Sequence, residues 1–70
     1  MSNGFAHLTI ENIELSGGVM VVKFTNGTAE KFIDVKDWQY NQIMSAKNPS
    51  KELDHFARYI PHHPISKTRE

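Results

Sequence analysis

Hydrophobic and polar residues alternate on both sides of the dipeptide Asn26-Gly27, over residues 19–25 and 28–34. A period of two is typical of strands that bury one face. Asn-Gly between two such runs indicates a hairpin, because both residues tolerate the positive φ that a two-residue type I′ turn needs. We therefore predict a hairpin closed by this two-residue turn.

The predicted turn decides which residues share a face of the hairpin. It sets Lys23 opposite Glu30, and opposite charges across a strand pair are favourable. The face that we assign to the core consists of Met20, Val22, Phe24, Ala29 and Ile33. The other face then carries Val19, Val21, Lys23, Glu30 and Phe32.

A second turn at Gly17-Gly18 adds a strand over residues 13–16 and sets Leu15 beside Met20 on the core face. Upstream, Leu8 and Ile10 have the opposite parity to the core positions of that strand. A bulge near residues 11–12 reconciles the two patterns. The alternative is a separate strand over residues 5–10, and parity does not decide between the two.

The period changes after the hairpin. Asp34 or Asp37 is positioned to cap the first turn of a helix that runs to about Lys47. At 100° per residue, Trp38 lies almost opposite the apolar side of this helix. That side is formed by Tyr40, Ile43, Met44 and the stem of Lys47.

A second helix is predicted after Asn48, which is suited to an N-cap, with Pro49 at the first helical position. Pro61 ends it. Its apolar positions recur at the spacing of one helix face and are Leu53, Phe56, Ala57 and Ile60.

Strands followed by helices indicate an α+β fold. We predict an antiparallel three-stranded β-meander followed by two short α-helices that pack on one face. Residues 1–65 form a single domain, the chain from Pro61 is extended, and residues 66–70 are a flexible C-terminal tail.

Composition narrows the functional classes. The chain has 70 residues and no cysteine, so a disulfide or a thiolate metal site is excluded. A domain this short is marginally stable, which favours self-association. Eight basic and eight acidic residues cancel. The chain therefore has no net positive charge, and so lacks the overall electrostatic attraction for nucleic acid that nonspecific nucleic-acid binders have. We expect a cytoplasmic protein without a membrane segment, since no apolar run is long enough and no secretory leader is visible.

The segment 18–60 contains a V-x-F-x-N-G-T turn segment formed by Val22, Phe24, Asn26, Gly27 and Thr28, followed by Val35, Tyr40, Ala46 and the stretch 56–59. At these positions it resembles the small KTSC-like domains of bacteria and phages. Lys36 stands where such domains often have proline, and Asn48-Pro49-Ser50 replaces their small link. The resemblance implies a hairpin followed by a helix. It implies little about function, because that family has no agreed activity and only an inferred association with nucleic acid.

Few residues of the chain are candidates for catalysis or metal binding. His55, Arg58 and Tyr59 on the second helix, with His62 or His63 beyond it, are the one set suited to acid/base catalysis on RNA. Their spacing matches no established metal-ligand pattern, and adjacent histidines in an extended segment point to opposite sides. We therefore predict no enzyme, no metal, no cofactor and no small-molecule substrate.

Binding of RNA or DNA is the alternative function. Basic residues of the C-terminal half would contact phosphates and an aromatic residue would stack on bases. Acidic residues in the same stretch oppose this. The candidate residues are Lys47, Lys51, Arg58, Tyr59, Lys67 and Arg69.

The function that the sequence favours is noncatalytic binding of another protein or of a second copy of the chain. Docking would use the second sheet face or strand addition at an open edge. Small regulators and phage-encoded inhibitors share this architecture. This is an analogy of fold, and no individual residue supports it. The candidate contact residues are Val19, Val21, Phe32 and Trp38.

Overall fold

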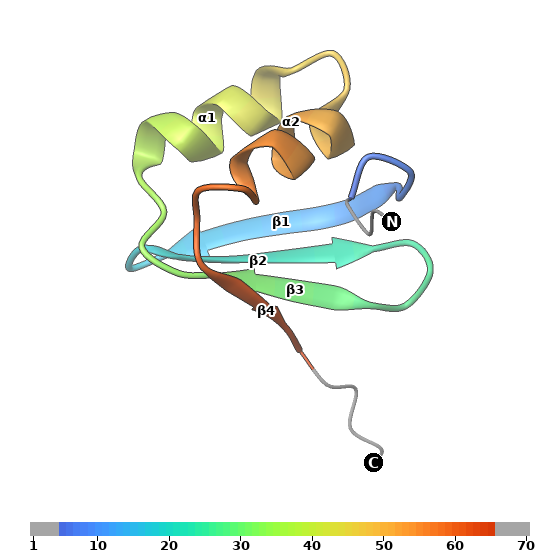
Figure 1. Cartoon of the computed structure of the whole chain (residues 1–70), viewed down its shortest axis with the longest axis horizontal. Coiled ribbons are helices and arrows are strands. Elements are labelled where there is room, and N and C mark those ends of the chain that lie inside the picture. Colours follow the sequence, from blue (N-terminus) through green and yellow to red (C-terminus); the bar gives the residue numbers. More distant parts are fainter. Residues whose placement is uncertain (1–4, 66–70) are drawn as a thin grey trace.

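A computed structural model describes residues 5–65 of the chain. It shows an α+β fold with a four-stranded antiparallel sheet in the order β1-β2-β3-β4 and two helices on one side of it (Figure 1). The elements are β1 (Ile10–Ser16), β2 (Val19–Phe24), β3 (Ala29–Phe32), α1 (Asp37–Ser45), α2 (Pro49–Phe56) and β4 (His62–Pro64). The α+β prediction is confirmed, and the sheet has one strand more than predicted.

The turn between β1 and β2 forms as predicted. Gly17 and Gly18 have φ angles of 58° and 82°, a conformation that glycine adopts without steric cost. Ser16 lies opposite Val19, and Leu15 opposite Met20, on the core face. The two glycines therefore fix the register of the first hairpin.

A bulge interrupts β1 at Glu11. Ile10 lies opposite Phe24, whereas Asn12 lies opposite Lys23, so the β1 strand has one residue more than its partner. The bulge lets residues on both sides of it face the core, which confirms the first of the two alternatives. Residues 5–9 are not a strand but turn before β1.

The β2–β3 register differs from the prediction by one residue. The N–H of Phe24 donates to the carbonyl of Thr28 at 2.9 Å, which leaves three residues in the loop rather than two. The N–H of Gly27 donates to the carbonyl of Phe24 at 3.1 Å, and Gly27 alone in the loop has a positive φ, 92°. This is the pattern of a type I turn followed by a left-handed glycine, so the type I′ prediction is wrong.

The shifted register exchanges the faces of β3. Met20 lies opposite Phe32 and Val22 opposite Glu30, so both β3 residues turn to the core side. Phe32 is completely buried, against the prediction that it lies on the second face. Lys23 lies opposite Ala29 and does not pair with Glu30. The second face therefore loses its aromatic residue.

Helix α1 is capped differently from the prediction. Lys36, not Asp34 or Asp37, occupies the N-cap, and its N–H donates to the side-chain Oε1 of Gln39 at 2.8 Å. This contact is one half of a capping box. The helix ends at Ser45, two residues before the predicted end.

Helix α2 begins as predicted. The side chain of Asn48 accepts a hydrogen bond from the N–H of Lys51 at 3.3 Å, and Pro49 is the first helical residue. Leu53, Phe56 and Ile60 are buried, which confirms the apolar side of this segment. The helix itself ends at Phe56, before the predicted end at Pro61, and residues 57–59 form a turn.

The core lies between the sheet and the helix pair (Figure 1). From α1 only Ile43 is fully buried, whereas Met44, predicted to face the core, is 51% exposed. The buried apolar residues are Ile13, Met20, Val22, Phe24, Phe32, Val35, Ile43, Leu53, Phe56 and Ile60.

The segment predicted as a simple extended tail forms β4, which pairs antiparallel with β3. Two hydrogen bonds flank the pairing, from the N–H of Ile33 to the carbonyl of Pro61 at 2.9 Å and from the N–H of Ile65 to the carbonyl of Ala29 at 3.0 Å. Because β4 covers the outer edge of β3, that edge is not open to another strand. The predicted flexible tail, residues 66–70, lies outside the described residues.

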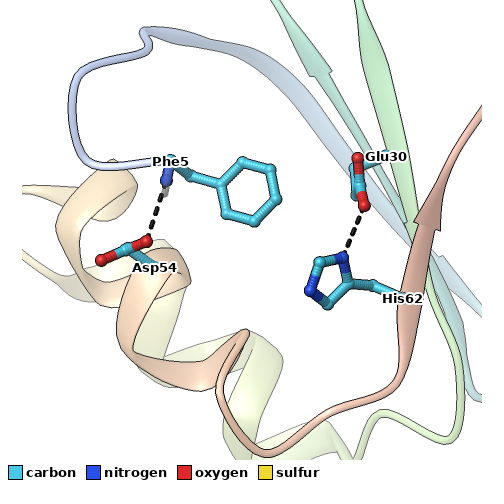
Figure 2. A network of polar contacts seen from close by, with 4 residues as sticks. All are labelled: Phe5, Glu30, Asp54 and His62. Carbon is cyan, nitrogen blue, oxygen red and sulfur yellow. Dashed lines mark hydrogen bonds and ion pairs between the residues drawn. The ribbon is translucent and has the colours of Figure 1, made fainter. Parts of the chain in front are cut away.

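A partly buried contact between a histidine and a carboxylate attaches β4 from the core side. Nδ1 of His62 lies 2.5 Å from a carboxylate oxygen of Glu30, whose side chain is 11% exposed. The Phe5 ring points toward this pair, and its own N–H donates to the carboxylate of Asp54 on α2 at 2.9 Å (Figure 2). The His62 ring also stacks on Phe32 at 4.8 Å between centroids. The N-terminal segment, α2, β3 and β4 thus meet around one small polar network.

Candidate protein-interaction surface

Trp38 is the most exposed large apolar side chain of α1. It is the second residue of the helix, away from the side that carries Ile43, and is 59% exposed. Its ring lies edge-on to the ring of Phe56 in α2, with 5.9 Å between centroids. Because Phe56 is buried, a core residue holds the tryptophan in place while most of its surface faces solvent.

The aromatic contacts continue from Phe56 along α2. His55 lies 5.8 Å from Phe56 and 5.5 Å from Tyr59, both edge-on. Tyr59 is 69% exposed and lies in the turn after α2, where its N–H donates to the carbonyl of Phe56 at 2.9 Å. We call Trp38, Phe56, His55 and Tyr59 the aromatic ridge. Exposed aromatics lie at both ends of this series of ring contacts, and the exposed His55 and the buried Phe56 connect them.

Charges of both signs border the aromatic ridge. An open depression of about 410 Å³ runs beside His55 and is lined by Lys51, Glu52, Asp54, His55 and Arg58. Glu52 accepts a hydrogen bond from the side chain of Gln42 at 2.8 Å, which ties α1 to α2. Two bases and two acids cancel here. The surface beside the ridge therefore has no net attraction for phosphate from these four side chains.

The predicted contact face on the sheet is not formed as an apolar surface. Val19 and Val21 lie on the open side and are partly buried, but Phe32 has turned inward. Val21 is flanked by Glu14 on β1 and Lys31 on β3. Of the four predicted contact residues, Trp38 alone is a large exposed apolar side chain, and it lies on the helix side.

The predicted nucleic-acid residues are brought together only in part. Lys51 and Arg58 line the same depression, with Tyr59 adjacent in the chain. Lys47 lines a different depression, between the N-terminal segment and the start of α2. Lys67 and Arg69 lie outside the described residues.

The histidines do not gather into a metal site. Within residues 5–65, no three side chains of His, Cys, Asp or Glu are grouped to hold an ion. His62 is engaged with Glu30, while His63 is exposed and lies opposite Lys31, away from the core side. His55 and Tyr59 do touch through their rings, but the depression beside them is open and mixed in charge.

Two contacts, one on this surface and one on the core side of the sheet, were not predicted from the sequence. The Trp38–Phe56 contact joins different helices, and helical spacing carries no information on such contacts. The Glu30–His62 pair depends on the three-residue loop. That loop turns Phe32 and Glu30 to the core in place of Ala29 and Ile33, so buried apolar area alone does not decide between the two registers.

Comparison of the chain with models of protein families, with curated protein sequences and with solved structures gives no match. In the described part of the chain, neither helix has the length and apolar character needed to cross a bilayer.

Proposed function

We propose that this protein is a small noncatalytic interaction domain that binds another protein through the aromatic ridge. The observation that carries the proposal is the exposure of Trp38 and Tyr59 at 59% and 69% while contacts through His55 and Phe56 join them to the core. Exposed aromatics on a surface held by core packing lose little conformational entropy on binding.

The composition of the surface supports a protein partner. Trp, Tyr and Arg are the residues that most often dominate protein–protein binding energy, and Trp38, Tyr59 and Arg58 lie on or beside the aromatic ridge. Mixed charges around apolar anchors are typical of the rim of such an interface. A regulator or inhibitor that acts by occupying a partner's surface needs no further chemistry.

Binding of single-stranded nucleic acid is the second candidate. Tyr59 with Lys51 and Arg58 is the observation that favours it, because a base stacks on an exposed ring beside cationic groups. Glu52 and Asp54 in the same depression oppose it. The protein partner is therefore the preferred proposal.

The KTSC-like resemblance, a bacterial or phage origin and a cytoplasmic setting are further parts of the proposal. The lack of cysteine fits a reducing compartment.

The test is site-specific photo-crosslinking in the source cells. A photoreactive phenylalanine replaces Tyr59 in one variant and Thr28, an exposed residue that follows the β2–β3 loop, in a matched control. We expect the variant at position 59 to trap a defined protein that the control at position 28 does not trap.

Calorimetry with the purified partner then measures the contribution of the ridge. Trp38→Ala should weaken binding by about 2 kcal/mol, roughly thirtyfold, as for a typical hot-spot residue. Val21→Ala on the open sheet face is the control and should leave binding unchanged. Crosslinks at position 59 to RNA or DNA alone, or unchanged affinity of Trp38→Ala, would reject the proposal.

A further inference from the structure

Strand β1 presents an edge that no described strand covers. In the order β1-β2-β3-β4 its inner side pairs with β2 and its outer side ends the sheet. In an antiparallel ladder, alternate residues of a strand direct their N–H and C=O groups away from the partner, so part of the β1 backbone points outward. The opposite edge, β4, has only three residues and ends at a proline, which lacks an N–H. Strand β1 is therefore the edge suited to strand addition, over the regular residues 12–16 that follow its bulge.

A small apolar depression lies beside this edge on the helix side. Met44 of α1, which is 51% exposed, forms part of its wall. Its volume of about 250 Å³ is below the usual range of small-molecule sites, roughly 300–1,000 Å³, and suits a single side chain. It is lined by Ile10, Glu11, Asn12, Ile13, Met44 and Pro49.

The charge of β1 indicates which kind of strand can pair with its open edge. Glu11 and Glu14 are exposed, and the strand has no basic residue. Glu14 lies on the open face, because its β2 neighbour is Val21. Two copies of β1 side by side would gather four carboxylates along one seam, and like charges across strands are destabilising. A cationic strand would instead gain attraction at the same positions.

We propose that β1 binds an extended cationic segment of a protein partner by strand addition. The segment alternates apolar and basic residues. Its apolar side chains face the helices, with one in the depression at Met44, and its basic side chains lie beside Glu14 on the open face. This site is separate from the aromatic ridge and does not depend on it.

The first test uses synthetic peptides and the full chain. A seven-residue peptide that alternates Val and Lys should shift the amide NMR signals of β1 and slow hydrogen exchange there. A peptide that alternates Val and Glu should bind at least tenfold more weakly. The Val/Lys peptide with alternate backbone amides N-methylated keeps its charge but cannot pair as a strand, and should not bind.

Variants of the protein complete the test. Glu14→Lys should weaken the Val/Lys peptide roughly three- to tenfold, because it replaces an attraction by a repulsion. Trp38→Ala should leave the peptide affinity unchanged, so failure at β1 is distinguishable from failure of the aromatic ridge.

Three results would overturn the proposal. The first is equal affinity of the N-methylated or the Val/Glu peptide. The second is a set of shifts on the ridge instead of β1. The third is a dimer paired through β1 in sedimentation experiments, which would identify the occupant as a second copy.

Discussion

Phe32 gives the sharpest test of the β2–β3 register. With the three-residue loop its ring is completely buried, opposite Met20 and stacked on His62. With the two-residue loop it would lie on the open face. A substitution at this position therefore separates the two registers by its effect on the free energy of unfolding.

The magnitude follows from burial. Replacing a buried Phe by Ala costs about 3–5 kcal/mol through lost transfer free energy and the cavity left behind. A domain of this length has roughly 4–10 kcal/mol of total stability, so Phe32→Ala would remove between about a third and all of it. The milder Phe32→Leu should cost about 1–2 kcal/mol and remain measurable.

The assay is urea unfolding followed by circular dichroism. Val21→Ala is the control, because Val21 is partly buried on the open face and should cost about 1 kcal/mol or less. Phe32→Leu should lower the midpoint more than Val21→Ala, with the same denaturant slope. If Phe32→Leu costs no more than Val21→Ala, the three-residue register is wrong.

Two further predictions concern the N-cap of α2 and the attachment of β4. Asn48→Ala removes the acceptor for the N–H of Lys51 and should destabilise the domain by about 1 kcal/mol in thermal unfolding. The control is Asn41→Ala, exposed within α1, which should change stability by less than about 0.5 kcal/mol. Equal effects of the two substitutions would contradict the capping role. His62→Ala leaves the buried Glu30 carboxylate without its partner, so it should cost about 1–3 kcal/mol of stability and speed hydrogen exchange at the N–H of Ile65. The control His63→Ala should change neither the stability nor the exchange. Unchanged exchange in His62→Ala would show that the contact with Glu30 does not hold β4.

Local signals predicted the parts of the fold that depend on neighbouring residues. The two glycines at 17 and 18 accept the positive φ of a tight turn without steric cost, and the opposite parity on either side of Glu11 left the bulge as one of two alternatives. Asn48-Pro49 begins a helix because capping and proline geometry act within one turn. In each of these places residues close together in the chain favour the local geometry that is observed.

The errors occurred where one local signal fits two structures. Asn-Gly serves both a two-residue type I′ turn and a three-residue loop in which glycine alone is left-handed. In the observed loop the side-chain oxygen of Asn26 accepts a hydrogen bond from the N–H of Thr28 at 3.0 Å, a contact that favours Asn without positive φ. A single residue of slip reverses both faces of a strand, and this misplaced Phe32 and Glu30 together.

Contacts between residues far apart in the chain could not be predicted from local sequence patterns. The three residues of β4 are too few for a periodic signal, and their pairing depends on an open β3 edge and on Glu30. Trp38 was predicted to lie off the apolar side of its helix, and it does. Its partner Phe56 was assigned only to the core, so the aromatic ridge emerged from the packing of α1 on α2.

The position of β4 has a consequence for biosynthesis. Translation proceeds from the N-terminus, so β4 leaves the ribosome after every other described element. Until then the nascent chain carries β3 with an unpaired edge and Glu30 without its imidazole, and such edges invite association with other chains. The β3 edge of this protein is therefore covered only when His62 emerges, and truncation before that residue should yield a chain that aggregates through this edge instead of a smaller folded domain.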